Sequence, residues 1–77
     1  MIKSRVFGFV IERGGFSWDE RFWYDLPIVK KRGFASDDRA TVFASVCEAE
    51  KALEVIEEEY GHYCYVTALS DLYPPAI

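Results

Sequence analysis

The stretch SVCEAEKALEVIEEEYG, residues 45–61, is the part of the sequence that decides the fold. Its apolar residues recur at spacings of three and four, which is the period of an amphipathic helix. Ser45 and Glu48 form a capping box at its start, and Gly61 suits the left-handed conformation that ends many helices. We therefore expect one α-helix that packs on the rest of the chain through an apolar stripe. The stripe consists of Val46, Ala49, Ala52, Leu53, Ile56 and Tyr60.

The same stretch is strongly acidic, with six glutamates against one lysine in a chain whose net charge is −4. The glutamates are Glu48, Glu50, Glu54, Glu57, Glu58 and Glu59. Glutamates in the last helical turn oppose the helix macrodipole, and like charges four residues apart repel each other. Such a cluster of unfavourable local choices is typical of a functional surface. The alternative is a solvated helix face that keeps a small protein soluble.

Several segments outside the helix have the composition of β-strands. Val, Ile and Phe are frequent in them, and apolar residues alternate at period two. The expected strands are residues 5–12, residues 16–28 with a bend at Asp19 and Glu20, residues 39–44, and residues 62–69. We expect residues 30–33 to form a basic turn. Residues 70–77 are expected to be a tail, because Pro74 and Pro75 cannot continue a strand.

These elements predict one α+β domain that spans residues 1–77. The expected order is β-β-β-α-β, which suits a mostly antiparallel sheet with the acidic helix packed on one face. Thirteen aromatic residues, or 17% of the chain, are more than one helix and one sheet face conceal. We therefore expect Trp18, Trp23 and Tyr24 to contribute to an exposed surface that binds a partner.

No pattern for catalysis, metal binding or cofactor binding is present. His62, Cys64 and Cys47 lack the spacing of a zinc site, and no glycine-rich loop precedes a helix. We expect a non-enzyme without metal or cofactor. No apolar run approaches the length of a membrane span, and two cysteines are too few for a disulfide scaffold, so the sequence predicts a cytoplasmic protein that does not bind membranes.

Residues 5–10, Arg-Val-Phe-Gly-Phe-Val, match part of the octapeptide with which RNA-recognition domains stack on bases. The match fails at Val6 and at Glu12, and the motif belongs after a β-α-β unit that four preceding residues cannot supply. The sequence pI of about 4.8 also disfavours phosphate binding. Single-strand RNA binding is therefore a minor alternative, and direct nucleic-acid binding is not expected.

Residues 40–53, ATVFASVCEAEKAL, resemble a pattern in small bacteriophage and mobile-element proteins, in which a strand ending in Phe leads into a Glu-Ala-Glu helix. In its small size, its acidity and its expected sheet with one helix, the chain also resembles anti-CRISPR proteins. That resemblance implies an inhibitor located in the host cytoplasm. It also implies that the acidic surface occupies the DNA-binding surface of an effector complex.

The leading hypothesis is a protein-binding inhibitor or accessory protein. Carboxylates four residues apart on a helix are separated by about 6 Å, similar to successive phosphates of a DNA strand. Glu50, Glu54 and Glu58, flanked by Glu57 and Glu59, would then bind a row of Lys and Arg on a nucleic-acid-binding protein. The alternative from another class is a self-associating protein that buries an aromatic sheet face in a homodimer.

Overall fold

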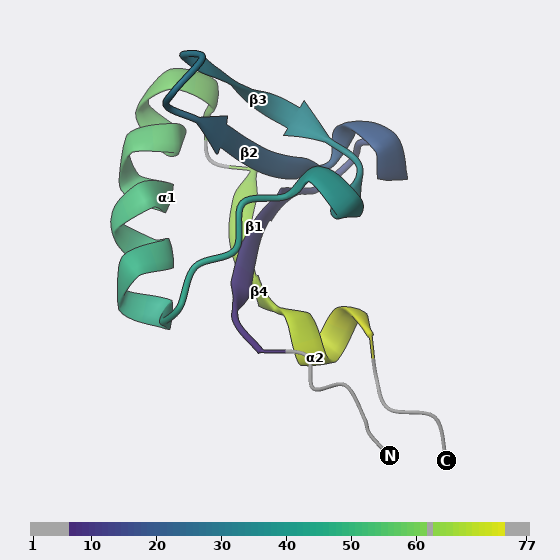
Figure 1. Ribbon diagram of the computed structural model, residues 1–77. Helices are drawn as coiled ribbons and strands as arrows, with labels where there is room; N and C mark the ends of the chain where they lie inside the picture. Colours follow the sequence, from purple (N-terminus) through teal and green to yellow (C-terminus); the bar gives the residue numbers. More distant parts are fainter. Residues whose placement is uncertain (1–6, 62, 74–77) are drawn as a thin grey trace.

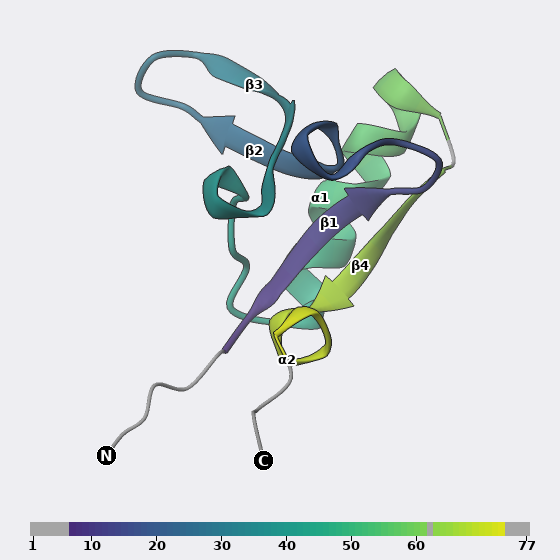
Figure 2. The same ribbon diagram turned by 90° about the vertical axis from the view of Figure 1, so that its right-hand side faces the viewer.

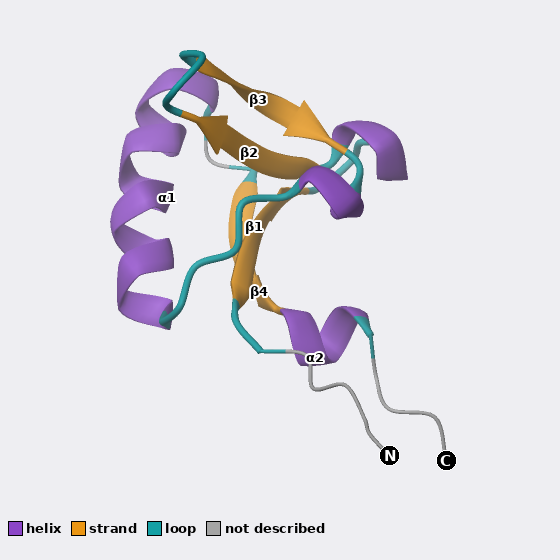
Figure 3. Ribbon diagram, in the orientation of Figure 1, coloured by secondary structure: helices purple, strands orange, loops and turns teal. Residues whose placement is uncertain are grey.

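The computed structural model describes residues 7–61 and 63–73. The strands are β1 (Phe9–Arg13), β2 (Phe22–Leu26), β3 (Lys31–Ala35) and β4 (Cys64–Ala68). The helices are α1 (Val46–Tyr60) and the short α2 (Leu69–Leu72), and 3-10 turns form η1 (Trp18–Glu20) and η2 (Asp37–Arg39). The predicted α+β class with a β-β-β-α-β order is confirmed, and α2 follows the last strand (Figure 3).

The four strands form one antiparallel sheet in the order β3-β2-β1-β4. β1 and β4 pair at five positions, and β2 and β3 pair at five positions as a hairpin. β1 and β2, in contrast, share only the pair of Glu12 and Phe22. The sheet therefore consists of two ribbons that are joined at one corner.

The β2–β3 hairpin extends away from β1 beyond this corner, as Figure 2 shows. The segment before α1 lies beside the outer half of β2 instead. There the amide of Thr41 donates to the carbonyl of Trp23 at 3.0 Å, and the amide of Asp25 donates to the Thr41 hydroxyl at 2.7 Å. α1 packs on one face of the sheet and faces both ribbons (Figure 1).

Both ends of α1 have the predicted caps. The hydroxyl of Ser45 accepts the amide of Glu48 at 3.2 Å and donates to the Glu48 carboxylate at 3.2 Å. Gly61 has a φ of 93°, which a residue with a side chain rarely adopts, and its amide donates to the carbonyl of Glu57 at 2.9 Å. The caps satisfy backbone groups that would otherwise lack partners at the helix ends.

The core lies between α1 and the sheet. Ile11, Trp23, Ile56 and Cys64 are buried at its centre. Side chains that pack around them come from Phe34, Phe43, Ala52, Leu53 and Val66. The predicted apolar stripe is confirmed at Ala49 and Ile56, which are buried, and is wrong at Val46, which is 42% exposed. Tyr60 is equally exposed, yet its ring packs edge-on against those of Trp23 and Phe34.

The sheet face opposite α1 is covered at its centre, contrary to our expectation of an open aromatic face. Val10 and Phe22 are at most 1% exposed there. The Trp18 ring of η1 packs edge-on over Phe22, with ring centroids 4.8 Å apart. The indole of Trp18 donates to Asp37 of η2 at 2.9 Å, and the Tyr73 hydroxyl also donates to Asp37. Loops and the C-terminal segment thus cover this face of the sheet, in the place where a second layer of helices could lie.

Several predicted boundaries are wrong. Residues 16–20 lie in a loop and η1 rather than in the second strand. The turn comprises residues 27–30, because the carbonyl of Pro27 accepts the Lys30 amide at 3.2 Å, and residues 31–33 belong to β3. Residues 39–44 form no strand and contribute one isolated bridge, between Phe43 and Phe9. The last strand ends at Ala68, and α2 forms where a tail was expected.

An acid-rimmed groove between the hairpin and the helix

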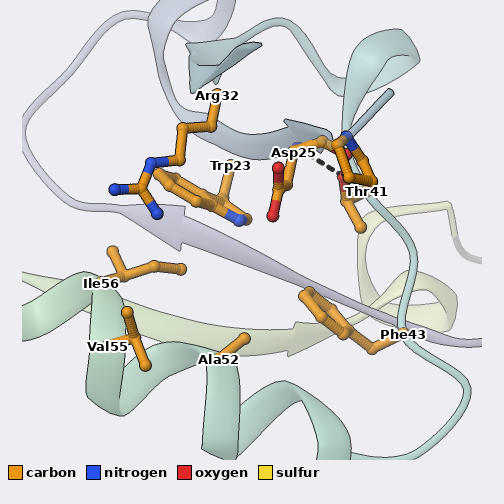
Figure 4. Close-up of a pocket in the computed structure, with 9 residues that line it drawn as sticks. Trp23, Asp25, Arg32, Thr41, Phe43, Ala52, Val55 and Ile56 are labelled. Atoms are coloured by element: carbon orange, nitrogen blue, oxygen red, sulfur yellow. Dashed lines mark hydrogen bonds between the residues drawn. The ribbon is translucent and has the colours of Figure 1, made fainter. Parts of the chain in front are cut away.

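A cavity of about 480 Å³ lies between the β2–β3 hairpin and α1. It is called the groove below. Its lining residues are Trp23, Asp25, Pro27, Arg32, Thr41, Phe43, Ala52, Val55 and Ile56. In Figure 4, Trp23 and Asp25 point from the hairpin toward the helix, and Ala52, Val55 and Ile56 point back from α1. The groove exists because β2 leaves β1 after one residue pair, so that hairpin and helix diverge.

The inner wall of the groove is apolar and fixed. Trp23 is only 4% exposed, and its indole is held edge-on by Phe34 at 5.4 Å and by Tyr60 at 5.7 Å between ring centroids. Aromatic pairs of this geometry add about 1 kcal/mol each to the burial of their area. Val55 is 51% exposed on the opposite wall. The groove therefore offers a preformed apolar surface to an entering side chain.

The hairpin contributes a carboxylate to the edge of the groove. Asp25 shares its strand face with Trp23, because side chains two residues apart point the same way. The backbone of Asp25 is fixed by Thr41, whose hydroxyl accepts the Asp25 amide (Figure 4). This bond positions an exposed carboxylate next to the apolar wall.

Arg32 and Glu59 span the groove between β3 and α1. The Nη2 atom of Arg32 lies 2.6 Å from Oε1 of Glu59, and the two side chains are 46% and 41% exposed. An ion pair with this exposure contributes about 0 to 1 kcal/mol to stability. Its position matters more than its strength, because it places the guanidinium of Arg32 at the groove mouth.

One stripe of α1 faces the groove. Glu48, Ala52, Val55 and Glu59 follow one another at intervals of four, three and four residues, so they lie along the same side of the helix. Ala52 and Val55 line the groove, and Glu48 and Glu59 therefore bracket it. Asp25 and Arg32 line the groove themselves, whereas Glu59 is joined to it by its ion pair with Arg32, and the Glu48 carboxylate accepts the Ser45 hydroxyl one turn before Ala52. We call Asp25, Glu48 and Glu59 the rim.

The other predicted glutamates lie away from the groove. Glu50, Glu54 and Glu58 are exposed and are called the outer glutamates. In the part of the chain that the structure describes, their side chains make no ion pair or hydrogen bond. Glu57 is half-buried on the same side of α1 as Glu50. The acidic surface is therefore divided between the rim and the outer face, and only Glu59 of the predicted set belongs to the groove.

The three predicted aromatic site residues separate in the structure. Trp23 is buried and forms the groove wall, so the prediction that it is exposed is wrong. Trp18 is 47% exposed on the opposite sheet face, beside Asp37. Tyr24 also points away from α1, since it alternates with Trp23, and it lines a second cavity of about 250 Å³ with Leu26, Lys31 and Arg39. No single aromatic surface unites them.

Trp18, Asp37 and Tyr73 form a polar cluster on that opposite face. The hydroxyl of Tyr73 and the indole of Trp18 donate to the Asp37 carboxylate, which lowers the pKa of Asp37. The hydrogen bond to Asp37 raises the pKa of Tyr73 to about 12. Both shifts stabilise the same pair of protonation states, a charged aspartate and a neutral phenol. The cluster joins η1, η2 and the C-terminal segment, so it has a structural role.

Glu12 is a buried carboxylate on the same face and is only 5% exposed. Its oxygens accept the hydroxyls of Thr67 at 2.6 Å and Tyr65 at 3.2 Å, and the guanidinium of Arg21 lies 3.6 Å away. Burial is tolerated because the charge has several partners. Burial and the Glu12 charge raise the pKa of Tyr65. The carboxylate is thus satisfied within the fold.

Within residues 7–61 and 63–73, no group of three His, Cys, Asp or Glu side chains has the arrangement of a metal site. Cys47 is exposed on α1, and Cys64 is buried in the core, where burial raises the pKa of its thiol. His62, the third residue considered for a zinc site in the sequence, lies outside the described residues. Residues 5 and 6 of the RNA-binding motif also lie outside, while Phe9 is half-buried beside Phe43.

Sequence reasoning missed most of the groove. Asp25, Thr41 and Phe43 come from segments that were expected to be an ordinary strand interior and a third strand. Val55 and Glu48 were attributed to the helix alone. The stripe at positions 48, 52, 55 and 59 was the available signal, because it carries small and apolar residues between two glutamates.

Comparisons of the chain with protein-family models, curated proteins and solved structures gave no match. Among the described residues, no helix has the length and apolar character needed to cross a membrane.

Proposed function

We propose that the protein is a non-enzymatic binding protein whose groove receives a basic segment of a partner protein. The segment carries an apolar side chain that enters the groove. Its Lys or Arg side chains lie on the rim. One observation supports this proposal: an apolar, preformed cavity lies next to three carboxylates, those of Asp25, Glu48 and Glu59.

The cavity supports binding more than catalysis. Its volume lies within the range of about 300 to 1,000 Å³ that is usual for ligand sites, and its deeper wall is apolar. Among the polar residues that line it, Thr41 accepts the Asp25 amide and Arg32 pairs with Glu59. The Asp25 carboxylate is the polar group that remains to contact a ligand. An apolar anchor supplies affinity at such a site, and the surrounding charges accelerate encounter.

The charges favour a basic protein as the partner. Six glutamates of α1 repel nucleic-acid phosphates and attract Lys and Arg. The outer glutamates are spaced by about 6 Å along the helix, and they extend the attraction beyond the rim. Proteins that bind nucleic acid carry rows of Lys and Arg that would match this spacing of carboxylates, so they are the proposed class of partner. An inhibitor that occupies such a surface, as the resemblance to anti-CRISPR proteins implies, is the proposed role.

A defined set of octapeptides tests the groove. The probe has a central Leu-Leu pair flanked by two Lys pairs, and its controls replace either the leucines by Ser or the lysines by Glu. Amide and indole NMR signals report the binding site. We expect the probe to bind with a Kd below about 1 mM and to shift the signals of Trp23, Thr41 and Val55. Both controls should leave these signals unchanged.

Two variants identify the site of binding. Ala52→Phe places an aromatic ring in the groove against Trp23 and Phe43 and should abolish the shifts, whereas Ala44→Phe adds the same ring at an exposed position outside the groove and should preserve them. Probe binding that both variants retain, or shifts confined to the outer glutamates, would contradict the groove as the binding site.

A further inference from the structure

The tip of the β2–β3 hairpin is an exposed apolar turn. Ile28 is 96% exposed, Val29 is 62% exposed and Leu26 is 50% exposed. Figure 2 shows this hairpin reaching away from the rest of the molecule. Three neighbouring apolar side chains at the end of a projecting hairpin are costly in water, which is typical of a surface that becomes covered.

The turn also has unfavourable residues for its backbone. Lys30 has a φ of 54°, although turns of this kind favour Gly, Asn or Asp at a left-handed position. Two β-branched residues, Ile28 and Val29, precede it. A left-handed residue other than glycine costs about 1 to 2 kcal/mol. A chain that keeps an apolar turn under strain, where a glycine turn would be more stable, indicates that the side chains of the tip have a function.

The tip has the chemistry that the groove accepts. Residues 26–36 contain Lys30, Lys31 and Arg32 and no acidic residue, while the α1 segment holds six glutamates and one lysine. Ile28 and Val29 provide apolar side chains, and Lys30 and Lys31 follow them directly. The groove presents an apolar wall with carboxylates at its edge. The two surfaces are complementary in both polarity and charge.

A chain does not fill its own groove with its own tip. Pro27 and Arg32 line the groove, so the tip begins at its edge. In Figure 2 the hairpin reaches away from the rest of the molecule. The turn of residues 27–30 is closed by the hydrogen bond from the Lys30 amide to the Pro27 carbonyl at 3.2 Å, which holds the tip in line with β2 and β3. Tip and groove are therefore neighbours at one end of the molecule. Two copies related by a two-fold axis can place each tip in the groove of the other copy.

We propose that the hairpin tip of one copy occupies the groove of a second copy, which gives a reciprocal dimer. This inference rests on the proposed function, since it requires that the groove accept a basic, apolar segment. It also gives that function a regulator: the dimer conceals the groove, and a partner segment competes with the tip. Partner binding then releases monomers.

Sedimentation velocity over a range of protein concentrations measures the association. Ile28 and Val29 are both replaced by Asp in a tip variant, which should shift the dimer Kd upward by at least about tenfold. Val55→Lys gives a groove variant that introduces a cation opposite Lys30, and it should have the same effect. Tyr63→Asp adds a charge at an exposed aromatic residue away from the tip and should leave the dimer Kd unchanged. Circular dichroism verifies that each variant is folded.

An equimolar mixture of the two defective variants provides the decisive measurement. The tip variant retains its groove, and the groove variant retains its tip, so one of the two contacts can form. We expect the mixture to associate more tightly than either variant alone and less tightly than the native chain. A mixture that remains monomeric, while the native chain dimerises, would show that another surface forms the dimer and would overturn the proposal.

Other outcomes separate this proposal from the function of the groove. A native chain that stays monomeric at all concentrations overturns the dimer, while binding of the Lys- and Leu-containing octapeptide would leave the proposed function standing. Loss of both dimer and octapeptide binding overturns both. A monomeric chain that binds vesicles of anionic lipid through Ile28 and Val29 would identify the tip as a membrane contact and would likewise overturn the dimer.

Discussion

Arg32 of β3 and Glu59 of α1 form an ion pair across the mouth of the groove, with 2.6 Å between Nη2 and Oε1. The pair joins the two elements whose divergence creates the groove. It also decides the charge that an entering segment meets. The guanidinium of Arg32 repels a cation and engages one of the three rim carboxylates, so the pair opposes the binding of a basic segment.

Arg32→Gln should therefore tighten the binding of the Lys- and Leu-containing octapeptide. The expected gain is about two- to fivefold, since an exposed charge contributes about 1 kcal/mol or less. Lys30→Gln removes the same charge from the hairpin tip and should change the affinity less. NMR titration of both variants at low salt measures the difference. Weaker binding to the Arg32 variant would show that the guanidinium is itself a contact for the segment.

The core between α1 and the ribbons should dominate stability. Ile11 is 0% exposed, and Ile11→Ala should cost about 2 to 5 kcal/mol in the free energy of unfolding. Val46 was expected to be buried but is exposed, so Val46→Ala should change stability by less than about 0.5 kcal/mol. Urea denaturation measures both. A large loss of stability from Val46→Ala would show that Val46 is packed in the core, as the apolar stripe predicted.

The helix was predictable because its signals are local. The capping box of Ser45 and Glu48 and the Gly61 terminus depend on neighbouring residues, and both are present in the structure. The strand boundaries depend on tertiary pairing, which the pattern does not contain. Residues 39–44 have β-prone residues, yet Thr41 binds the edge of β2 through its side chain and Phe43 forms one bridge. Their place beside the hairpin prevents a regular strand.

The acidity of α1 was predictable from the sequence, whereas the shape of the groove beside it was not. The composition of α1 indicated a basic partner, and the excess of aromatics indicated a contact surface. The groove itself depends on the single β1–β2 pair of Glu12 and Phe22, which no local pattern predicts. Trp23 and Tyr24 were both predicted to be exposed, but adjacent residues of a strand point to opposite faces, and α1 covers the face that carries Trp23.

The hydrogen bond of Tyr73 to Asp37 should make stability depend on pH. The pKa of Asp37 is lowered from 3.8, so its contribution is present above about pH 4 and is lost as the pH falls through the folded-state value. The pKa of Tyr73 is raised from 10.0 to about 12, so its contribution is present below about pH 10 and is lost as the pH rises through about 12. Both contributions to stability are therefore fully present only between about pH 4 and about pH 10.

Tyr73→Phe should therefore destabilise the protein by about 1 kcal/mol or less near neutral pH, because the pair is largely exposed. The difference from the native chain should shrink below about pH 4. Urea denaturation at about pH 3 and about pH 7 measures it. Trp18→Phe, which removes the other side-chain donor to Asp37, provides the comparison. A difference that is independent of pH would attribute the effect to ring packing.

The two cysteines should differ in reactivity. Cys47 is exposed, whereas Cys64 is buried with a raised thiol pKa. Because the thiolate is the reactive form, iodoacetamide should label Cys47 in the folded protein and label Cys64 only after unfolding. Mass spectrometry of the labelled peptides measures this. Equal labelling of both residues in the folded state would contradict the burial of Cys64 between β4 and α1.

Two variants of equal charge test the groove as the binding site most directly. One replaces the rim residues Asp25, Glu48 and Glu59 by Asn, Gln and Gln, and the other replaces the outer glutamates Glu50, Glu54 and Glu58 by Gln. Each removes three negative charges. The measurement is the Kd of the Lys- and Leu-containing octapeptide at low salt. We predict at least about tenfold weaker binding to the rim variant and less than about threefold to the outer variant. Equal weakening would mean that only net charge matters, and a larger loss from the outer variant would place the binding site on the solvent-facing side of α1.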